Sequence, residues 1–180
     1  MAPKIAMVLM LAMNMAGLVL ADTALAEQYT NTAIEIDEEI ARGDMALISI
    51  AQEINRPTEG TGLHIVVAYA LGSRVVRKVS ISRGLETVIL QTDYYLDHHG
   101  EQLLLVRYTQ TGVIDERFSD SYEFAYDDGN PMAIRRSDTW DSELSDGTMN
   151  EAQFYARRLP SVTTLARDVV SGVVNLGTTF

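Results

Sequence analysis

The spacing of hydrophobic residues first predicts a helical region near the start of the chain. From residue 32 to 54 apolar side chains recur every three to four positions, which is typical of an amphipathic helix. Thr32 and Glu35 fit a capping box that would begin the helix. Gly43 and Asp44 interrupt the pattern, and Asp44 could cap a second segment. The pattern therefore predicts either one bent helix or two short ones.

From Leu63 onward apolar residues alternate at every second position, which is typical of β-strands. Glycine-containing turns separate successive runs, notably at Gly72, Gly100 and Gly129. The runs cover residues 63–71, 74–81, 88–96, 103–107, 122–126 and 132–136. Because neighbouring runs are joined by turns, the sequence predicts an antiparallel β-meander of about six strands.

Two of the predicted hairpins match when they are aligned with an offset of 29 residues. Gly100 then corresponds to Gly129, and Arg107 corresponds to Arg136. Two copies are too few for a solenoid, so we interpret them as successive hairpins of one sheet. Pro131 cannot donate a ladder hydrogen bond, which places it at a strand start or at an edge.

Helical spacing returns near the end of the chain. Residues 138–147 are acidic and rich in serine, which indicates a loop, and Thr148 and Glu151 form a second capping box. We expect Pro160 to stop or kink the helix, and an apolar stripe continues over residues 162–173. The predicted fold is α+β, an antiparallel β-meander sheet flanked by N-terminal and C-terminal helices that pack on one face.

The first 26 residues have the pattern of a secretory signal peptide. Lys4 precedes an apolar run at 5–20, and Ala24-Leu25-Ala26 forms a small-x-small cleavage site, with Val19-Leu20-Ala21 as an earlier alternative. An uncleaved membrane anchor is the other interpretation, although the run is short for one. We therefore predict a cleaved signal peptide at 1–26 and a single α+β domain at 27–180. Such a protein would be periplasmic or extracellular, with no stable membrane insertion after cleavage.

Composition narrows the classes of partner and of chemistry. The 180-residue chain has a formal net charge of −11, which disfavours nucleic acid and anionic membranes and is compatible with a basic partner, a metal ion or no charged partner. It contains no cysteine, so disulfides, thiolate catalysis and cysteine-ligated zinc are excluded. An exported domain without disulfides must be stabilised by an ordinary hydrophobic core.

Arginines on three predicted strands suggest a binding site. Arg77, Arg107 and Arg136 share the alternation of the apolar residues, and a guanidinium there must reach solvent, pair with a carboxylate or bind an anion. With neighbouring aromatic residues they define a candidate ligand site, which consists of Arg77, Arg107, Arg136, Tyr94, Tyr108 and Trp140. The alternative is that the arginines pair internally at sheet ends while the aromatic residues belong to the core.

The residues that could support metal binding or catalysis are few. His98 and His99, beside Asp97 and Glu101 at a predicted turn, are weak candidates for a transition-metal site. Adjacent strand residues point to opposite faces and turns are usually polar, so we predict no metal and no cofactor. The sequence lacks a nucleophile elbow, a zinc-binding helix and a phosphate-binding glycine loop, and we predict no enzymatic activity.

These observations favour an exported, non-enzymatic binding protein that engages a protein partner as an inhibitor or an immunity protein would. In size, charge and export alone the chain resembles periplasmic immunity proteins, and the resemblance implies no particular residues. The acidic segments 115–128 or 138–146 would then face a basic partner. The alternatives are a small-molecule or lipid carrier with a cavity between the sheet and the C-terminal helix, and a hydrolase with dispersed carboxylates.

Overall fold

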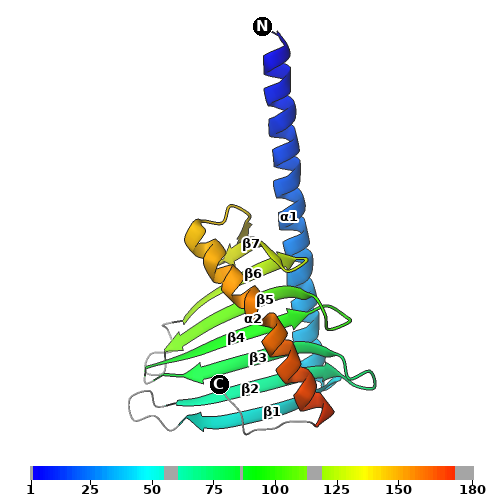
Figure 1. Cartoon of the computed structure of the whole chain (residues 1–180), viewed down its shortest axis with the longest axis vertical. Coiled ribbons are helices and arrows are strands. Elements are labelled where there is room, and N and C mark those ends of the chain that lie inside the picture. The colour runs from blue at the N-terminus through cyan, green and yellow to red at the C-terminus, as the bar shows by residue number, and fades with distance from the viewer. Residues whose placement is uncertain (1, 55–60, 86, 113–118, 173–180) are drawn as a thin grey trace.

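The computed structural model describes residues 2–54, 61–85, 87–112 and 119–172, with the side chains of 2–21, 52–54 and 61 left out. Two helices enclose one sheet (Figure 1). The helices are α1 (Ala2–Arg42) and α2 (Asp146–Ser171). The strands are β1 (Met45–Ile54), β2 (Thr61–Ala70), β3 (Val76–Gly84), β4 (Val88–Leu96), β5 (Leu103–Gly112), β6 (Ser119–Asp127), β7 (Asn130–Arg136) and β8 (Thr139–Asp141).

The sheet is an antiparallel meander in which each strand pairs with the next one along the chain, in the order β1 to β8. This confirms the predicted α+β class and the meander order. Within the described residues the sheet has eight strands instead of about six. The two additional strands are β1, where a helix was predicted, and β8, where a loop was predicted.

The predicted helix over residues 32–54 is wrong beyond Arg42. Gly43 adopts a left-handed conformation with φ 78°, and its N–H donates to the carbonyl oxygen of Ile40 at 3.1 Å. Such a glycine ends a helix at little steric cost. The following residues of β1 then pair with ten consecutive residues of β2, so strand pairing overrides the helical spacing of the apolar residues.

Both predicted capping boxes are also wrong. Thr32 lies inside α1, where its hydroxyl donates to the carbonyl oxygen of Gln28 at 3.2 Å. The N-cap of α2 is Ser145, whose hydroxyl accepts a hydrogen bond from the backbone N–H of Thr148 at 3.3 Å. Pro160 lies within α2 and does not end the helix, because the helix continues to Gly172, its C-cap at φ 75°.

The two helices lie on opposite faces of the sheet, which corrects the expectation that both would pack on one face (Figure 1). Tyr94 and Tyr95 show this division, since neighbouring strand residues point to opposite faces. Tyr94 is buried with Tyr155 of α2, whereas Tyr95 is buried with Ile36 of α1.

The larger core lies between the sheet and α2. Tyr94, Val106 and Phe124 occupy one register row across β4, β5 and β6, and each is at most 1% exposed. The hydroxyl of Tyr126 donates to the carbonyl oxygen of Ala152 at 2.9 Å, which ties the start of α2 to β6. The buried residues that α2 contributes to this core are Ala152, Tyr155, Val162, Ala166 and Val169.

On the other face, small residues allow α1 to lie close to the sheet. Ala125 on β6 and Ala133 on β7 are fully buried against Ala26 of the helix. Further along α1, Ala33 and Ile36 pack on the residues of β4 and β5. The C-terminal part of α1 therefore forms part of the folded domain, and Figure 1 shows the N-terminal part of the helix extending past the sheet.

Candidate functional site

One register row on the α1 face carries alternating charges across four strands. Asp93 on β4 lies opposite Arg107 on β5, which lies opposite Glu123 on β6, which in turn lies opposite Arg135 on β7. The carboxylate of Glu123 forms ion pairs with both arginines, at 2.7 Å from Arg107 Nε and 2.6 Å from Arg135 Nη2. Trp140 on β8 ends the row, and the guanidinium of Arg135 lies 5.6 Å from its ring centroid.

Asp37 of α1 connects this row to the helix. Its carboxylate accepts hydrogen bonds from Lys78 Nζ at 2.7 Å, Arg107 Nη1 at 2.9 Å and the Tyr95 hydroxyl at 2.9 Å. Lys78 also lies 3.3 Å from the carboxylate of Asp93. We call this set the charge network, and its members are Asp37, Lys78, Asp93, Tyr95, Arg107, Glu123 and Arg135.

The charge network is buried at its two strand carboxylates and internally neutralised, as expected of a structural feature. Asp93 and Glu123 are 4% and 5% exposed, and three carboxylates face three cationic side chains. Burial alone would raise the pKa of Asp37, but the hydrogen bonds and charge of Lys78, with Tyr95 and Arg107, hold the pKa below its ordinary value. The Asp37 contribution to stability is therefore present above about pH 4 and is lost as the pH falls below that.

The six residues of the predicted ligand site lie in different parts of the fold. Arg107 and Trp140 lie in the charged row, on the α1 face. Tyr94 and Tyr108 belong to the α2 face, where Tyr94 is 1% exposed and cannot reach a ligand.

The remaining two arginines lie apart from that row. Arg77 is the extra residue of a bulge between β2 and β3, and its buried Nε has no hydrogen-bond partner within the described residues. Arg136 is an exposed residue on β7 opposite Tyr122. A single site with the three arginines side by side is therefore not formed.

The structure also explains why Arg136 was matched to Arg107. The row that contains the paired residues Tyr95 and Leu105 continues on the second hairpin through Ala125 and Ala133. Nine residues separate the first pair and seven the second, so residues of one row are 28 apart after the turns and Arg107 shares its row with Arg135. A shift of one residue moves a side chain to the other face of a sheet.

Sequence reasoning missed the acidic half of the charge network. Asp93 and Glu123 each precede strongly apolar strand residues, and the next strand supplies an arginine in each case. A carboxylate inside an apolar strand followed by an arginine on its neighbour is the signal that could have identified them. Asp37 carried no such signal, because its partners come from strands far along the sequence.

The side chain of Asp97 stabilises the turn that contains His98 and His99. Its carboxylate accepts hydrogen bonds from the backbone N–H groups of Glu101 at 2.8 Å and Gln102 at 3.0 Å. Partial burial alone would raise the pKa of Asp97, but these hydrogen bonds hold it below the ordinary value. The ring centroids of His98 and His99 are 3.8 Å apart. Among the residues that the structure describes, no group of three or more potential ligands is placed to hold a metal ion.

A serine and a histidine also meet on the uncovered part of the α1 face. Ser49 Oγ and His64 Nε2 are 2.7 Å apart, a distance suited to a nucleophile and its base. Both side chains are exposed, and the contacts between described residues give His64 no carboxylate that would orient its ring. Within the described residues, this pair therefore has neither a third group that orients the imidazole nor an enclosure.

An aromatic surface flanked by carboxylates lies on the other face, beside α2. Tyr108 and Tyr122 stack with ring centroids 4.9 Å apart, and the hydroxyl of Tyr122 donates to the carboxylate of Glu151. Phe154 is 52% exposed on α2, and burial together with the charges of Glu151 and Asp120 raises the pKa of Tyr108. We call these residues the aromatic patch, and its members are Tyr108, Asp120, Tyr122, Glu151 and Phe154.

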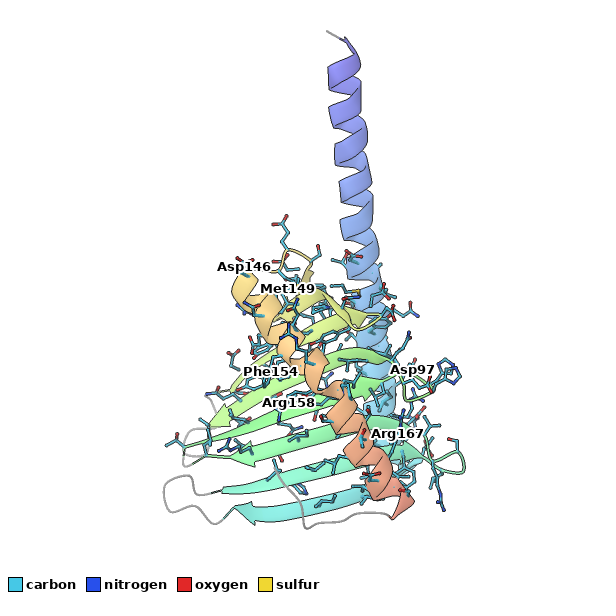
Figure 2. The ribbon with its side chains drawn as sticks, viewed as in Figure 1. Asp97, Asp146, Met149, Phe154, Arg158 and Arg167 are labelled. Carbon is cyan, nitrogen blue, oxygen red and sulfur yellow. The ribbon has the colours of Figure 1, made fainter. Side chains whose placement is uncertain are left out.

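Next to the aromatic patch, side chains of α2, β2 and β3 line a shallow groove. Figure 2 shows Phe154 and Arg158 following each other along α2, and the guanidinium of Arg158 lies 5.2 Å from the Phe154 ring centroid. The groove has a volume of about 90 Å³ and is lined by Leu63, Ile65, Ile81, Arg158, Ser161, Val162 and Leu165. Ligand pockets usually hold roughly 300 Å³ or more, so this groove gives the carrier hypothesis no support.

The raised pKa values of buried tyrosines predict that the fold is lost at high pH. Burial raises the pKa of Tyr126, and it raises the pKa of Tyr155 to about 12, with a further contribution from Glu151. A raised pKa stabilises the fold below the ordinary value of about 10, and this stabilisation is lost as the pH rises toward 12. We expect cooperative unfolding between about pH 10 and 12, with tyrosinate absorbance appearing together with the loss of circular dichroism. Complete ionisation near pH 10 without unfolding would contradict this.

Comparison of the chain with protein-family models, with curated proteins and with solved structures gives no significant match. Within the part of the chain that the structure describes, no helix combines the length and the apolar character needed to cross a membrane.

Proposed function

We propose that the chain is an exported, non-enzymatic binding protein that engages a basic protein partner through the aromatic patch. The signal pattern at the N-terminus supports export. The observation that carries the proposal is the exposed Phe154, which lies three residues along α2 from Glu151, the carboxylate that accepts a hydrogen bond from Tyr122 of the stacked pair.

The composition of the aromatic patch is that of an interface centre. Tyrosine, phenylalanine and arginine are enriched where proteins bind each other, and a few aromatic side chains usually supply most of the binding energy. Phe154 and the neighbouring Arg158 present such side chains on α2. Tyr108 and Tyr122 extend the same surface onto β5 and β6, where both are partly exposed.

Charge around the aromatic patch favours a basic partner. Asp120 and Glu151 lie at the patch, and Glu143 and Asp146 lie near the start of α2. With a net charge of −11, the protein would attract a cationic partner and speed the encounter more than it deepens the affinity. Residues 115–118 of the predicted acidic segment 115–128 lie outside the described residues.

A capture experiment with matched variants tests this proposal. We expect the purified protein to retain one stoichiometric basic partner from the exported fraction of its source. Phe154→Asp should weaken that complex by roughly 30-fold, which corresponds to about 2 kcal/mol for a central aromatic residue. Affinity is measured by calorimetry or surface plasmon resonance.

Ile89→Asp is the matched control, because Ile89 is 44% exposed on the opposite face of the sheet. This variant should bind the partner as the unaltered protein does. Equal losses in both variants, or a partner that binds without regard to Phe154, would contradict the proposed surface. An association rate that does not fall with added salt would contradict the proposed charge.

A further inference from the structure

Strand β1 forms one edge of the sheet and offers a long row of backbone hydrogen-bonding groups. It is ten residues long and, in the part of the chain that the structure describes, it pairs only with β2 (Figure 1). One side of this strand therefore carries N–H and C=O groups that can pair with a further strand.

The β1 edge lacks the features that normally prevent such pairing. Its sequence, MALISIAQEI, contains no lysine, arginine or proline and one charged residue, Glu53. Its register with β2 runs through ten residue pairs without a shift, whereas β2–β3, β4–β5 and β6–β7 each contain one. Leu47 on this strand is 52% exposed. Natural edge strands are usually blunted by charge, proline or bulges, so an edge of this kind indicates a partner strand.

The opposite edge of the sheet cannot supply that strand. Strand β8 has three residues, Ser137 before it has a positive φ of 62°, and Asp141 ends it. A contact between β1 of one copy and β8 of the next would generate an open fibre, and the short β8 disfavours it. The same strand on two copies gives a closed two-fold dimer.

We propose that two copies of this chain associate through antiparallel pairing of their β1 strands, centred on Ser49. Opposed residues in an antiparallel pair point to the same face, so the two-fold axis must pass through a residue. Centring on Ser49 places Leu47 opposite the partner's Ala51 and Ile48 opposite the partner's Ile50. Centring on Ile50 would instead place Leu47 opposite the partner's Glu53.

This register joins the sheets of the two copies into one continuous sheet. Each face of one sheet continues into the same face of the other. Ile48 and Ile50 already pack against the core beneath α2, so their pairing extends that apolar layer across the dimer. On the other face, Leu47 loses its exposure against the small Ala51. Dimerisation through β1 requires neither export nor the aromatic patch, so the dimer and the proposed function are independent of each other.

Molecular mass in solution tests the dimer. Analytical ultracentrifugation of the purified protein should give twice the mass of one chain at micromolar concentration. Leu47→Lys adds an edge charge at an exposed position and should give a monomer with unchanged circular dichroism. Phe154→Lys is the matched control, because Phe154 is also 52% exposed, and it should remain dimeric. A monomeric unaltered protein, or a dimer that tolerates Leu47→Lys, would overturn the proposal.

Cross-linking tests the register, and the absence of native cysteine removes any background. In Ser49→Cys the two thiols would lie opposite each other at a spacing that a disulfide bridges, so mild oxidation should give covalent dimers. In Ala51→Cys, two residues away on the same face, the thiols would be several residues apart and should not cross-link. Cross-linking of Ala51→Cys in place of Ser49→Cys, or of neither, would refute this pairing.

Discussion

Replacing Gly100 with alanine should destabilise the protein by about 2–5 kcal/mol, because strain and steric overlap add at this turn. Gly100 has φ 71°, and a Cβ there would lie 2.7 Å from the carbonyl oxygen of Val76 and 3.0 Å from Cγ1 of Val75. The first of these atoms belongs to the backbone of β3, so a rotamer change cannot relieve the overlap. The free energy of unfolding in urea measures the loss.

Gly129→Ala provides the matched control, since this glycine has a similar φ of 77° with nothing within 4 Å of its added Cβ. It should cost only about 1 kcal/mol, which is the price of the left-handed backbone alone. The difference between the two variants therefore isolates the packing of the Gly100 turn against β3. Equal losses in the free energy of unfolding for Gly100→Ala and Gly129→Ala would show that Gly100 does not pack closely against β3.

Replacing Arg107 with methionine should cost about 3–5 kcal/mol, because the change leaves the buried carboxylate of Glu123 and the half-buried carboxylate of Asp37 without their shared cation. Arg107 contacts both Glu123, which is 5% exposed, and Asp37 of α1. Without it, Glu123 keeps one arginine and Asp37 loses one of its two cationic partners. Urea unfolding again measures the change, and α1 should loosen from the sheet in hydrogen exchange.

Arg42→Met is the control for the charge network. Arg42 pairs with Glu38 and Asp44, but its side chain is 57% exposed, so its loss should cost at most about 1 kcal/mol. Adding Glu123→Gln to Arg107→Met should recover part of the loss, because the buried side chain that has lost one of its two arginines then carries no charge. Comparable losses for Arg42→Met and Arg107→Met, or no recovery in the double variant, would show that burial does not set the strength of these pairs.

The meander could be predicted because its information is local. Gly100 and Gly129 adopt positive φ at the predicted reversals, and alternating apolar residues mark the strands between them. Strand β1 could not be predicted in the same way, because its apolar residues also satisfy a helical spacing and only pairing with β2 decides between the two.

The charge network could not be predicted from the sequence for a different reason. Arg107 shares its register row with Arg135 and not with Arg136, and this depends on the number of residues in two turns. A difference of one residue would place the second arginine on the other face of the sheet. The position of Asp37 depends on how α1 lies across the finished sheet. The aromatic patch likewise combines residues of β5, β6 and α2, which only the packed structure brings together.

The order of the strands has a consequence for how the protein is made. Each strand pairs with the one synthesised just before it, so no strand waits for a distant partner. Topologies with such short sequence separations fold rapidly. The sheet can thus grow one hairpin at a time during synthesis, and α2, which follows the strands along the chain, then completes the larger core.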